Sequence, residues 1–479
     1  MQLIKSSKIA LAAASLLGAP HAASAGDSLN SEPDYPAQDE YVGMSSYWDE
    51  LNVENSTRSS QGNNSKTYAT SSTKSASSKR YTRKTPKTHA DKNSESSDWA
   101  HEASLLYYGE GDDRVEDNSF KYKGTLTTEE GSTLGVRVGW DSLTGASPSG
   151  GAPLSVAQAV TSPSGSVSTV YPDNELVLDY GFEDERIDAG ISWDQGIIDK
   201  KTRANVGVSV SKESDYLHVG VSSGISREFN NKDTTVSLGV AYSADTIEPA
   251  FNMATGLSDV STSEGVAKQS KDTIDFVVGL SQILSKDTIF QLNYGLSQAE
   301  GYLNDPYKRI SRVNSEGTKV VQNLNESRPT QRLGHNLFGA VRHNFSGDVL
   351  STSARLHTDD FGIDSVTLDA KYNIKINKTH SIEPHIRYYT QTAADFYTPQ
   401  LNADDPLPQY ASSDYRLAEF NSYSIGATYR FNTEDDKEWR ITTELYSQDP
   451  TEVERTEAQK DYNSNPGFNA LMTSVGVKF

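Results

Sequence analysis

Cysteine is absent from the 479 residues of this chain. Disulfide bonds and thiol chemistry are therefore excluded, and with them a small disulfide-held fold and a cysteine nucleophile. Stability must come from buried apolar surface or from strands that pair in a closed arrangement. The H-E-x-x-H, EF-hand and Walker A patterns are missing as well, so the sequence indicates no cofactor and no metal site of fixed geometry.

Long hydrophobic runs are also lacking after residue 25. Only 35% of the residues are hydrophobic, and the mean hydropathy is -0.61. No segment there offers the ~20 apolar residues that a transmembrane helix needs. The chain does contain 25 tyrosines and 34 glycines. Such a composition is typical of a transmembrane β-barrel, whose strands are apolar on one face only.

Negative charge outweighs positive charge and leaves a formal net charge of -21. A surface of that sign repels phosphate, so no nucleic-acid partner is expected. Acidic loops suit a bacterial cell surface. The partners that we expect from this setting are outer-membrane lipid, lipopolysaccharide and the barrel-assembly machinery.

The first 25 residues have the pattern of a secretory signal peptide. Lys5 and Lys8 precede a short apolar run over residues 9–17, and the small residues Ala23 and Ala25 mark a cleavage site. We therefore expect export, with the mature chain in the bacterial outer membrane.

Residues 26–98 are rich in serine, threonine, asparagine and lysine, as in ENSTRSSQGNNSKTYATSSTKSASSKR. A segment so poor in aliphatic residues cannot offset its ordering entropy, so we expect a disordered tail. Its later part, residues 79–92, is basic. That part is interpreted either as a solvated linker or as an arm that docks on an acidic periplasmic partner or cell-wall polymer.

From about residue 101 onward, apolar and polar residues alternate in segments of roughly ten residues. In TTVSLGVAYS, one face carries Val236, Leu238, Val240 and Tyr242. Tight polar turns such as FSGDV and INKTH alternate with long polar loops. A soluble β-sandwich also alternates, but the rhythm of short turns and long loops is typical of outer-membrane barrels.

We predict an all-β fold in which residues 99–479 form a transmembrane antiparallel up-and-down β-barrel. About 16 strands are expected, with 14 to 18 possible. The weakest candidates come first in the chain, near residues 101–110, 131–140, 174–182 and 185–194.

The final strand, ALMTSVGVKF, alternates up to the last residue. A barrel has no free edges, so the last strand must pair with the first strand, which fixes the C-terminus. Val475, Val477 and the terminal Phe479 also resemble the C-terminal signal that the bacterial assembly machinery recognises.

Four stretches together resemble the DUF3570 family of uncharacterised Gram-negative outer-membrane barrel proteins. They are LLYYGEGDDRVED, WDSLTGASPSGGAP, VSVSKESDYLHVGVSSG and YSADTIEP. The resemblance covers roughly residues 100–479 and implies a barrel, but the family carries no established activity. Its association with thioredoxin-like and flavin-attaching proteins implies extracytoplasmic redox partners.

If the aliphatic face meets lipid, the opposite face lines the lumen. In the later strands this face is charged, which either braces the barrel or sets up a field in an aqueous pore. The predicted lumen-lining residues are Arg355, His357, Asp369, Lys371, Lys375, Glu383, His385, Arg387, Arg430, Arg440 and Glu444. Earlier strands offer small residues instead: Gly207, Ser209, Gly239, Ala241, Gly295 and Ser297.

Small lumenal residues leave room for an inward plug, and LTGASPSGGAP is the candidate. Asp141, Gly145, Pro148 and Gly150 favour a tight, irregular backbone. The segment does not fit the G-x-S-x-G nucleophile elbow.

The leading interpretation is a porin-like or plugged channel for transport across the outer membrane. The alternative is a structural barrel that docks periplasmic or surface partners. We do not expect an enzyme. The third hypothesis, a barrel hydrolase, would use His343 and His357 with Ser346 and Ser351, which lie close to one turn.

Overall fold

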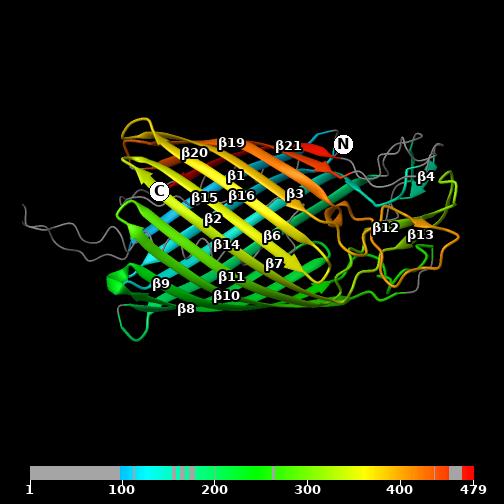
Figure 1. Ribbon diagram of the computed structural model, residues 1–479, viewed down its shortest axis with the longest axis horizontal. Helices are drawn as coiled ribbons and strands as arrows, with labels where there is room; N and C mark the ends of the chain where they lie inside the picture. The colour runs from blue at the N-terminus through cyan, green and yellow to red at the C-terminus, as the bar shows by residue number, and fades with distance from the viewer. Residues whose placement is uncertain are drawn as a thin grey trace, which may run out of the picture.

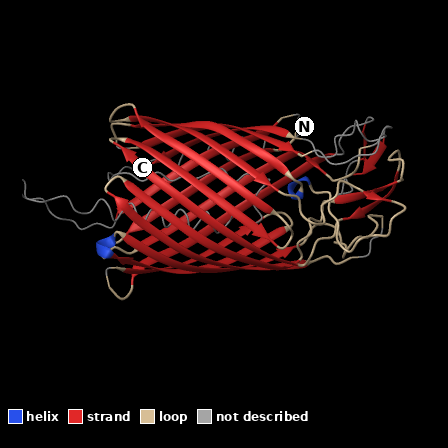
Figure 2. Ribbon diagram, in the orientation of Figure 1, coloured by secondary structure: helices blue, strands red, loops and turns tan. Residues whose placement is uncertain are grey.

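The computed structural model describes residues 98–111, 114–153, 158–161, 168–171, 178–199, 201–261, 265–435, 437–451 and 467–479. The expected signal peptide, and the expected tail up to residue 97, lie outside this part of the chain. No helix in the described part is long and apolar enough to span a membrane. Apart from two short 3-10 turns, η1 (Asn230–Lys232) and η2 (Tyr415–Leu417), the regular structure is β-strand (Figure 2).

Sixteen strands close into one antiparallel barrel, as the sequence predicted (Figure 1). Around the wall they are β1 (Asp98–Glu110), β2 (Glu116–Thr127), β3 (Thr133–Pro148), β6 (Leu178–Gly196), β7 (Thr202–Lys212), β8 (Tyr216–Phe229), β9 (Thr234–Ile247), β10 (Gln269–Ser285), β11 (Thr288–Gly301), β14 (Gln331–Phe345), β15 (Asp348–Asp359), β16 (Asp364–Lys375), β17 (His380–Gln391), β19 (Phe420–Asn432), β20 (Glu438–Pro450) and β21 (Phe468–Lys478).

The number of strands was right, but two of the expected strands were wrong. Strand β2 was missed because its outward series, with Phe120, Tyr122 and Leu126, is interrupted by Gly124. The expected strands 174–182 and 185–194 are one long strand, β6. Its polar centre falls at the barrel mouth, where a strand can be polar on both faces. The two errors cancel in the count.

The wall is apolar outside and polar inside. Along β9, Val236, Leu238 and Tyr242 are exposed on the outer face, whereas Ser237 and Asp245 are buried on the inner face. The other strands repeat this alternation, which confirms the expected outward apolar surface of a transmembrane barrel.

The two ends of the barrel differ. One end has short connections, which join β2 to β3, β6 to β7, β8 to β9, β10 to β11, β14 to β15, β16 to β17 and β19 to β20. The opposite end carries the long connections, which include a three-stranded sheet of β13 (Val320–Asn325), β12 (Arg309–Val313) and β18 (Leu401–Asn402) and a β-hairpin of β4 (Gln158–Thr161) and β5 (Ser168–Tyr171). Figure 1 shows β12 and β13 beyond the end of the wall.

The C-terminus closes the barrel as predicted. Strand β21 pairs with β1 from Lys478, opposite Glu102, to Ala470, opposite Glu110. Beyond the strand, Phe479 and His101 exchange backbone hydrogen bonds of 2.9 and 2.8 Å, and their rings stack at 5.3 Å. Val475 and Val477 lie within β21. Their role as an assembly signal stays a prediction.

Candidate functional site

The predicted lumenal charges lie on the inner face of five strands. They alternate with exposed outward residues such as Leu356, Leu368 and Ile386. Lys375 is exposed at the end of its strand. The residues are Arg355 and His357 on β15, Asp369, Lys371 and Lys375 on β16, Glu383, His385 and Arg387 on β17, Arg430 on β19, and Arg440 and Glu444 on β20.

His385 contacts two carboxylates, one on each side of its ring. Its Nε2 lies 2.6 Å from Asp369 Oδ2 on one side, and its Nδ1 lies 2.9 Å from Glu444 Oε2 on the other. Gly426 stands opposite both His385 and Glu444 on the strand between them. A Cβ at Gly426 would lie 2.9 Å from Glu444 Cβ, so glycine is what allows the two side chains to meet across a whole strand.

Two arginines complete this charged region. Arg430 Nη2 donates to Glu383 Oε1 at 2.9 Å. Arg440 forms an ion pair with Glu102 of β1, across the closing strand β21. Opposite charges on neighbouring strands therefore tie β16, β17, β19, β20 and β1 together, the bracing that cross-strand pairs provide.

The first strands are charged on their inner face too, which the sequence interpretation missed. Arg203 Nε donates to Asp194 Oδ1 at 2.6 Å, and Lys121 and Arg137 occupy inward positions of β2 and β3. The small residues that the sequence indicated lie on β7, β9 and β11, and the charges on β2, β3 and β6 were not predicted. In these strands the apolar residues of the outer face alternate least regularly, so the inward positions could not be identified from the sequence.

Small and uncharged polar side chains prevail on one sector of the inner face, formed by β7 to β11. We call this the small-residue sector. Its inward residues include Gly207, Ser209, Gly220, Ser222, Gly224, Ser237, Gly239, Ala241, Ser243, Thr273, Gly279, Ser281, Gln291, Asn293, Gly295 and Ser297. The charged exceptions include His218, Asp245, Lys271 and Asp275.

At the long-loop end, one connection crosses the mouth from β11 to β3. Lys308 Nζ donates to Pro148 O at 2.7 Å and to Ser147 Oγ at 3.1 Å. The Tyr307 hydroxyl donates to Asp215 in the β7–β8 turn at 2.5 Å. Strands β6 to β10 separate β3 from β11 in the wall, so this connection bridges distant parts of the rim.

The connection between β17 and β19 crosses the mouth in a second direction. Tyr415 packs edge-on against the inward Phe468 of β21, with ring centroids 6.4 Å apart. Two residues later, Leu417 packs in a buried cluster with Leu303, Phe361 and Ile363, near the ends of β11 and β15. We call residues 302–330 and 392–419 together the cap.

Buried ion pairs hold the two parts of the cap together. Asp414 is 1% exposed and accepts from Arg328 at 2.7 Å and from Arg416 at 2.5 Å. Arg416 also bonds Asp305, and Arg328 bonds Glu326, at 2.5 and 2.7 Å. Removing one partner of a buried pair costs ~3–5 kcal/mol because the other charge stays buried.

The electrostatics of the cap favour this closed arrangement. Burial alone would raise the pKa of Asp414, but Arg416 and Arg328 outweigh burial and hold that pKa well below its usual range. Burial raises the pKa of Glu326 and lowers the pKa of Lys308. Asp414 thus stays ionised at neutral pH and acts as the anchor of the network.

The predicted plug segment is split between wall and cap. Asp141, Gly145 and Pro148 lie on β3, and Gly150 lies in the connection that follows. Gly145 and Gly150 have positive φ values of 125° and 83°. A Cβ at Gly150 would lie 2.3 Å from Arg309 O at the start of β12. The cap therefore contacts the rim closely at this segment.

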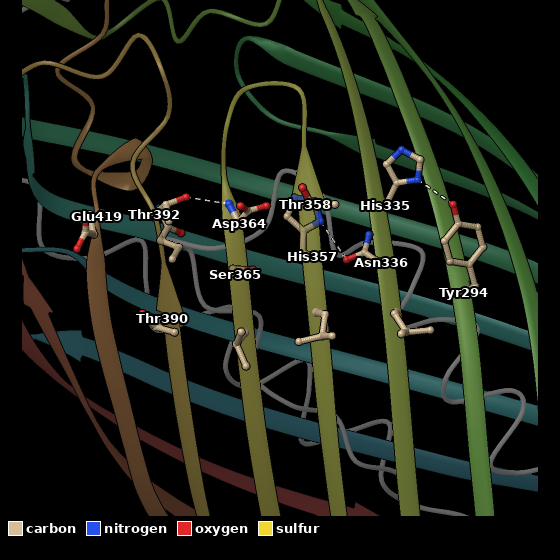
Figure 3. Close-up of a pocket in the computed structure, with 14 residues that line it drawn as sticks. Tyr294, His335, Asn336, His357, Thr358, Asp364, Ser365, Thr390, Thr392 and Glu419 are labelled. Carbon is tan, nitrogen blue, oxygen red and sulfur yellow. Dashed lines mark hydrogen bonds between the residues drawn. The ribbon is translucent and has the colours of Figure 1, made fainter.

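A hollow of about 590 Å³ lies over the ends of β11, β14, β15, β16 and β17 (Figure 3). Its floor includes the outward side chains of Leu337, Leu356 and Val366. At its edge the Tyr294 hydroxyl and His335 Nδ1 are 2.8 Å apart. An apolar floor with a polar rim on the outer wall suits the boundary between lipid tails and headgroups.

Three carboxylates gather at the rim above β6 and β7: Asp184, Glu213 and Asp215. Their oxygens are close enough to share one cation, within 4.8 Å of one another. Burial, and then the neighbouring Asp184, raise the pKa of Glu213 to about 7. Glu213 and Asp215 belong to one stretch, KESDYLH, whereas Asp184 comes from β6.

The hydrolase hypothesis named residues that the structure pairs otherwise. His343 Nδ1 lies 2.8 Å from the Thr288 hydroxyl, and His357 lies 3.1 Å from both Asn336 Oδ1 and Asp359 Oδ2. Neither contact joins a histidine to Ser346 or Ser351.

Comparisons with known proteins find a family model and distant solved structures. The family model described as "Protein of unknown function (DUF3570)" matches residues 67–479. CdiB from Acinetobacter baumannii is 6% identical with a TM-score of 0.39, over 80% of this chain and 60% of that one. The outer membrane protein opdK from Pseudomonas aeruginosa is 8% identical with a TM-score of 0.36, over 80% and 98%.

The siderophore receptor PirA from Acinetobacter baumannii is 8% identical with a TM-score of 0.36, over 74% of this chain and 53% of that one. This chain therefore spans less than two thirds of the length of the CdiB and PirA chains. No curated protein matches the sequence.

Proposed function

The chain belongs to the DUF3570 family of proteins of unknown function, and we propose that it is an outer-membrane channel for small polar solutes with a closable outer mouth. Its closed barrel with an apolar outer face fits a transmembrane position. Barrels of 16 to 18 strands leave an aqueous lumen.

The observation that carries the proposal is the cap over a polar lumen. The cap bridges β11 to β3 through Lys308, and β21 to β11 and β15 through Tyr415 and Leu417. A cap whose two parts are joined by buried ion pairs, and which meets the rim through hydrogen bonds and aromatic packing, can be seated on the rim or released from it as one unit. Such a device suits a barrel that passes solutes under control.

Within the lumen, the passage follows the small-residue sector. Glycine, alanine and serine project less into the lumen than the arginine, glutamate and histidine side chains on the other strands. The free cross-section therefore lies against β7 to β11. The charges opposite it, braced by pairs such as Arg430 with Glu383, set the field that a passing solute meets.

Planar-bilayer recording of the full-length protein tests the proposal. Discrete, salt-dependent conductance steps are expected. Asp414→Asn leaves Arg328 and Arg416 without their shared carboxylate, so it should raise the ratio of open to closed time at least about tenfold. Asp405→Asn, on an exposed part of the same connection, is the matched control and should leave the ratio unchanged.

A folded protein that stays silent, both as wild type and as Asp414→Asn, contradicts the channel. Folding is checked by migration in a gel before and after heating. The docking interpretation would then take precedence, and residues 26–98 would be the segment to truncate in a search for a partner.

A further inference from the structure

Three inward residues of the small-residue sector form a connected chain of hydrogen bonds. Ser209 is on β7, His218 on β8 and Asp245 on β9. Ser209 Oγ lies 3.3 Å from His218 Nε2, and His218 Nδ1 lies 2.7 Å from Asp245 Oδ1. Serine, histidine and carboxylate in this order are the parts of a nucleophile, a general base and the group that orients the base.

The strand register explains why these residues meet. His218 stands directly opposite Asp245 on β9, and Ser209 stands opposite Gly220, two positions along from His218. The serine therefore reaches the imidazole along a diagonal, a distance that cross-strand side chains can span. The arrangement is built on three hydrogen-bonded strands, which hold it more rigidly than loops would.

Glycine keeps the space between serine and histidine open. A Cβ at Gly220 would lie 2.6 Å from Ser209 Oγ and 2.9 Å from His218 Nε2. Any side chain there would separate the two groups. Glycine at position 220 is therefore what lets the Ser209 hydroxyl approach the His218 ring.

The hydrogen bonds set the roles of the two ring nitrogens. The Asp245 side chain is 4% exposed and the His218 side chain 30% exposed, so the carboxylate is buried behind the ring. Nδ1–H donates to Asp245, which leaves Nε2 with a lone pair that accepts from the Ser209 hydroxyl. Lys271 Nζ, 3.5 Å from Asp245 Oδ2, balances the charge of the carboxylate.

A cation is placed one strand away from the serine's strand, on the side opposite to His218. Gly190 of β6 is the register partner of both Arg137 on β3 and Ser209 on β7. A Cβ at Gly190 would lie 2.6 Å from Arg137 Nε, so the guanidinium extends over this glycine toward the serine's strand. Backbone N–H groups in a barrel wall are used in the ladder, so a side chain must supply the charge that stabilises an oxyanion.

We propose that Ser209, His218 and Asp245 form an esterase centre in the lumen, beneath the cap, acting on short-chain esters of polar alcohols such as acetylated sugars. The surrounding inward residues, including Gly207, Ser222 and Ser243, are small and polar. They offer no apolar pocket for a long acyl chain. Substrate reaches the centre through the lumen, so the inference rests on the proposed channel.

The reaction balances with water alone. Ser209 Oγ bonds the ester carbonyl carbon as its proton passes to His218 Nε2, and Arg137 stabilises the oxyanion. The carbon–oxygen bond to the alcohol breaks, and the leaving oxygen takes the proton from His218. Water then attacks the acyl-serine, giving its proton to His218. When the acid leaves, that proton returns to Ser209 Oγ.

The full-length protein in detergent is assayed with p-nitrophenyl acetate and labelled with a fluorophosphonate probe. Labelling should map to Ser209 by mass spectrometry. Ser209→Ala should abolish labelling and lower hydrolysis at least ~100-fold. Ser211→Ala is the matched control, because Ser211 stands directly opposite His218 in the register, and should change hydrolysis less than about twofold.

Asp245 is a positioning residue, so its test separates rate from binding. Asp245→Asn should lower kcat ~100-fold or more, with KM unchanged, because the wrong ring tautomer then faces the serine. Wild-type protein that is not labelled, or hydrolysis that survives Ser209→Ala, overturns the esterase. Bilayer recording of the wild-type protein separates the two claims, because a conducting but unlabelled wild type contradicts only the esterase and a labelled but silent wild type contradicts only the channel.

Discussion

Two histidines project into the barrel from different parts of the wall. Each has a carboxylate at one ring nitrogen, but the partner at the other ring nitrogen differs. His385, in the charged region, has a carboxylate at each ring nitrogen, Asp369 and Glu444. His218, in the small-residue sector, has a carboxylate at one ring nitrogen and the hydroxyl of Ser209 at the other.

This difference gives the two histidines different roles: His385 joins strands as a structural cation, which we call a brace, and His218 can act as a general base. Carboxylates accept hydrogen bonds, so a ring held between two of them must donate from both nitrogens and is present as the imidazolium. It joins three strands through charge and has no lone pair to offer. A ring held by one carboxylate keeps a lone pair for the serine. The neighbours of an inward histidine thus decide whether it stabilises the wall or does chemistry.

Removing the two rings should affect stability unequally. His385→Ala leaves Asp369 and Glu444 without the cation between them, and should lower the free energy of unfolding by ~3–5 kcal/mol. His218→Ala leaves Asp245 with Lys271 nearby, and should cost about 1 kcal/mol. Urea midpoints of both variants in lipid vesicles measure the difference, and equal losses would show that both rings are braces.

A second carboxylate should turn the base into a brace. Ser209→Asp places an acceptor at Nε2 of His218 and reproduces the surroundings of His385. We expect the free energy of unfolding to rise by about 1 kcal/mol, as for a new charge-assisted hydrogen bond, and fluorophosphonate labelling to disappear. Ser222→Asp, on the inner face of β8 and opposite Gly207 in the register, is the control for the added charge. The comparison breaks down if both variants shift the urea midpoint alike.

The rim near His218 offers a smaller and pH-dependent test through Glu213, which lies between β7 and β8. Burial, followed by Asp184, raises the pKa of Glu213 to about 7, above the ~4.3 of an unfolded glutamate. The protonated carboxyl therefore stabilises the fold at low pH, and this stabilisation is lost as the pH rises toward 7.

Glu213→Gln keeps a neutral side chain at every pH. It should raise the free energy of unfolding by about 1 kcal/mol at pH 8.5 and have little effect at pH 4.5. Glu248→Gln, an exposed glutamate in the next long connection, provides the control for a lost carboxylate. A gain that is the same at both pH values would rule out titration of Glu213 as its cause.

Alternation along single strands was enough to predict the barrel, its outward face and the inward position of residues such as His385 and Glu444. It could not predict their contact, which depends on register and on Gly426 in the strand between them. The Ser209–His218 contact was missed for the same reason. Ser209 was noted only as a small residue, and His218 was not among the predicted lumen-lining residues.

The cap was beyond the reach of the sequence for a different reason. Asp414, Arg328 and Arg416 lie in loops without period, and their pairing joins two connections far apart in the chain. The role of Asp141, Gly145, Pro148 and Gly150 as a plug stays a prediction, although Gly150 meets the start of β12. The part that crosses the mouth carried no comparable signal, because turn chemistry specifies local geometry and not a distant partner.

The path of solutes along the small-residue sector is the central claim, and the absence of cysteine makes it directly testable. Gly295→Cys places a thiol in that sector and Ser424→Cys places one among the charges, both on the inner face. Single-channel conductance is recorded before and after a positively charged methanethiosulfonate reagent. A reduced conductance step for Gly295→Cys, with little change for Ser424→Cys, is the predicted result. An unchanged step for Gly295→Cys, or a larger effect at position 424, would contradict the account.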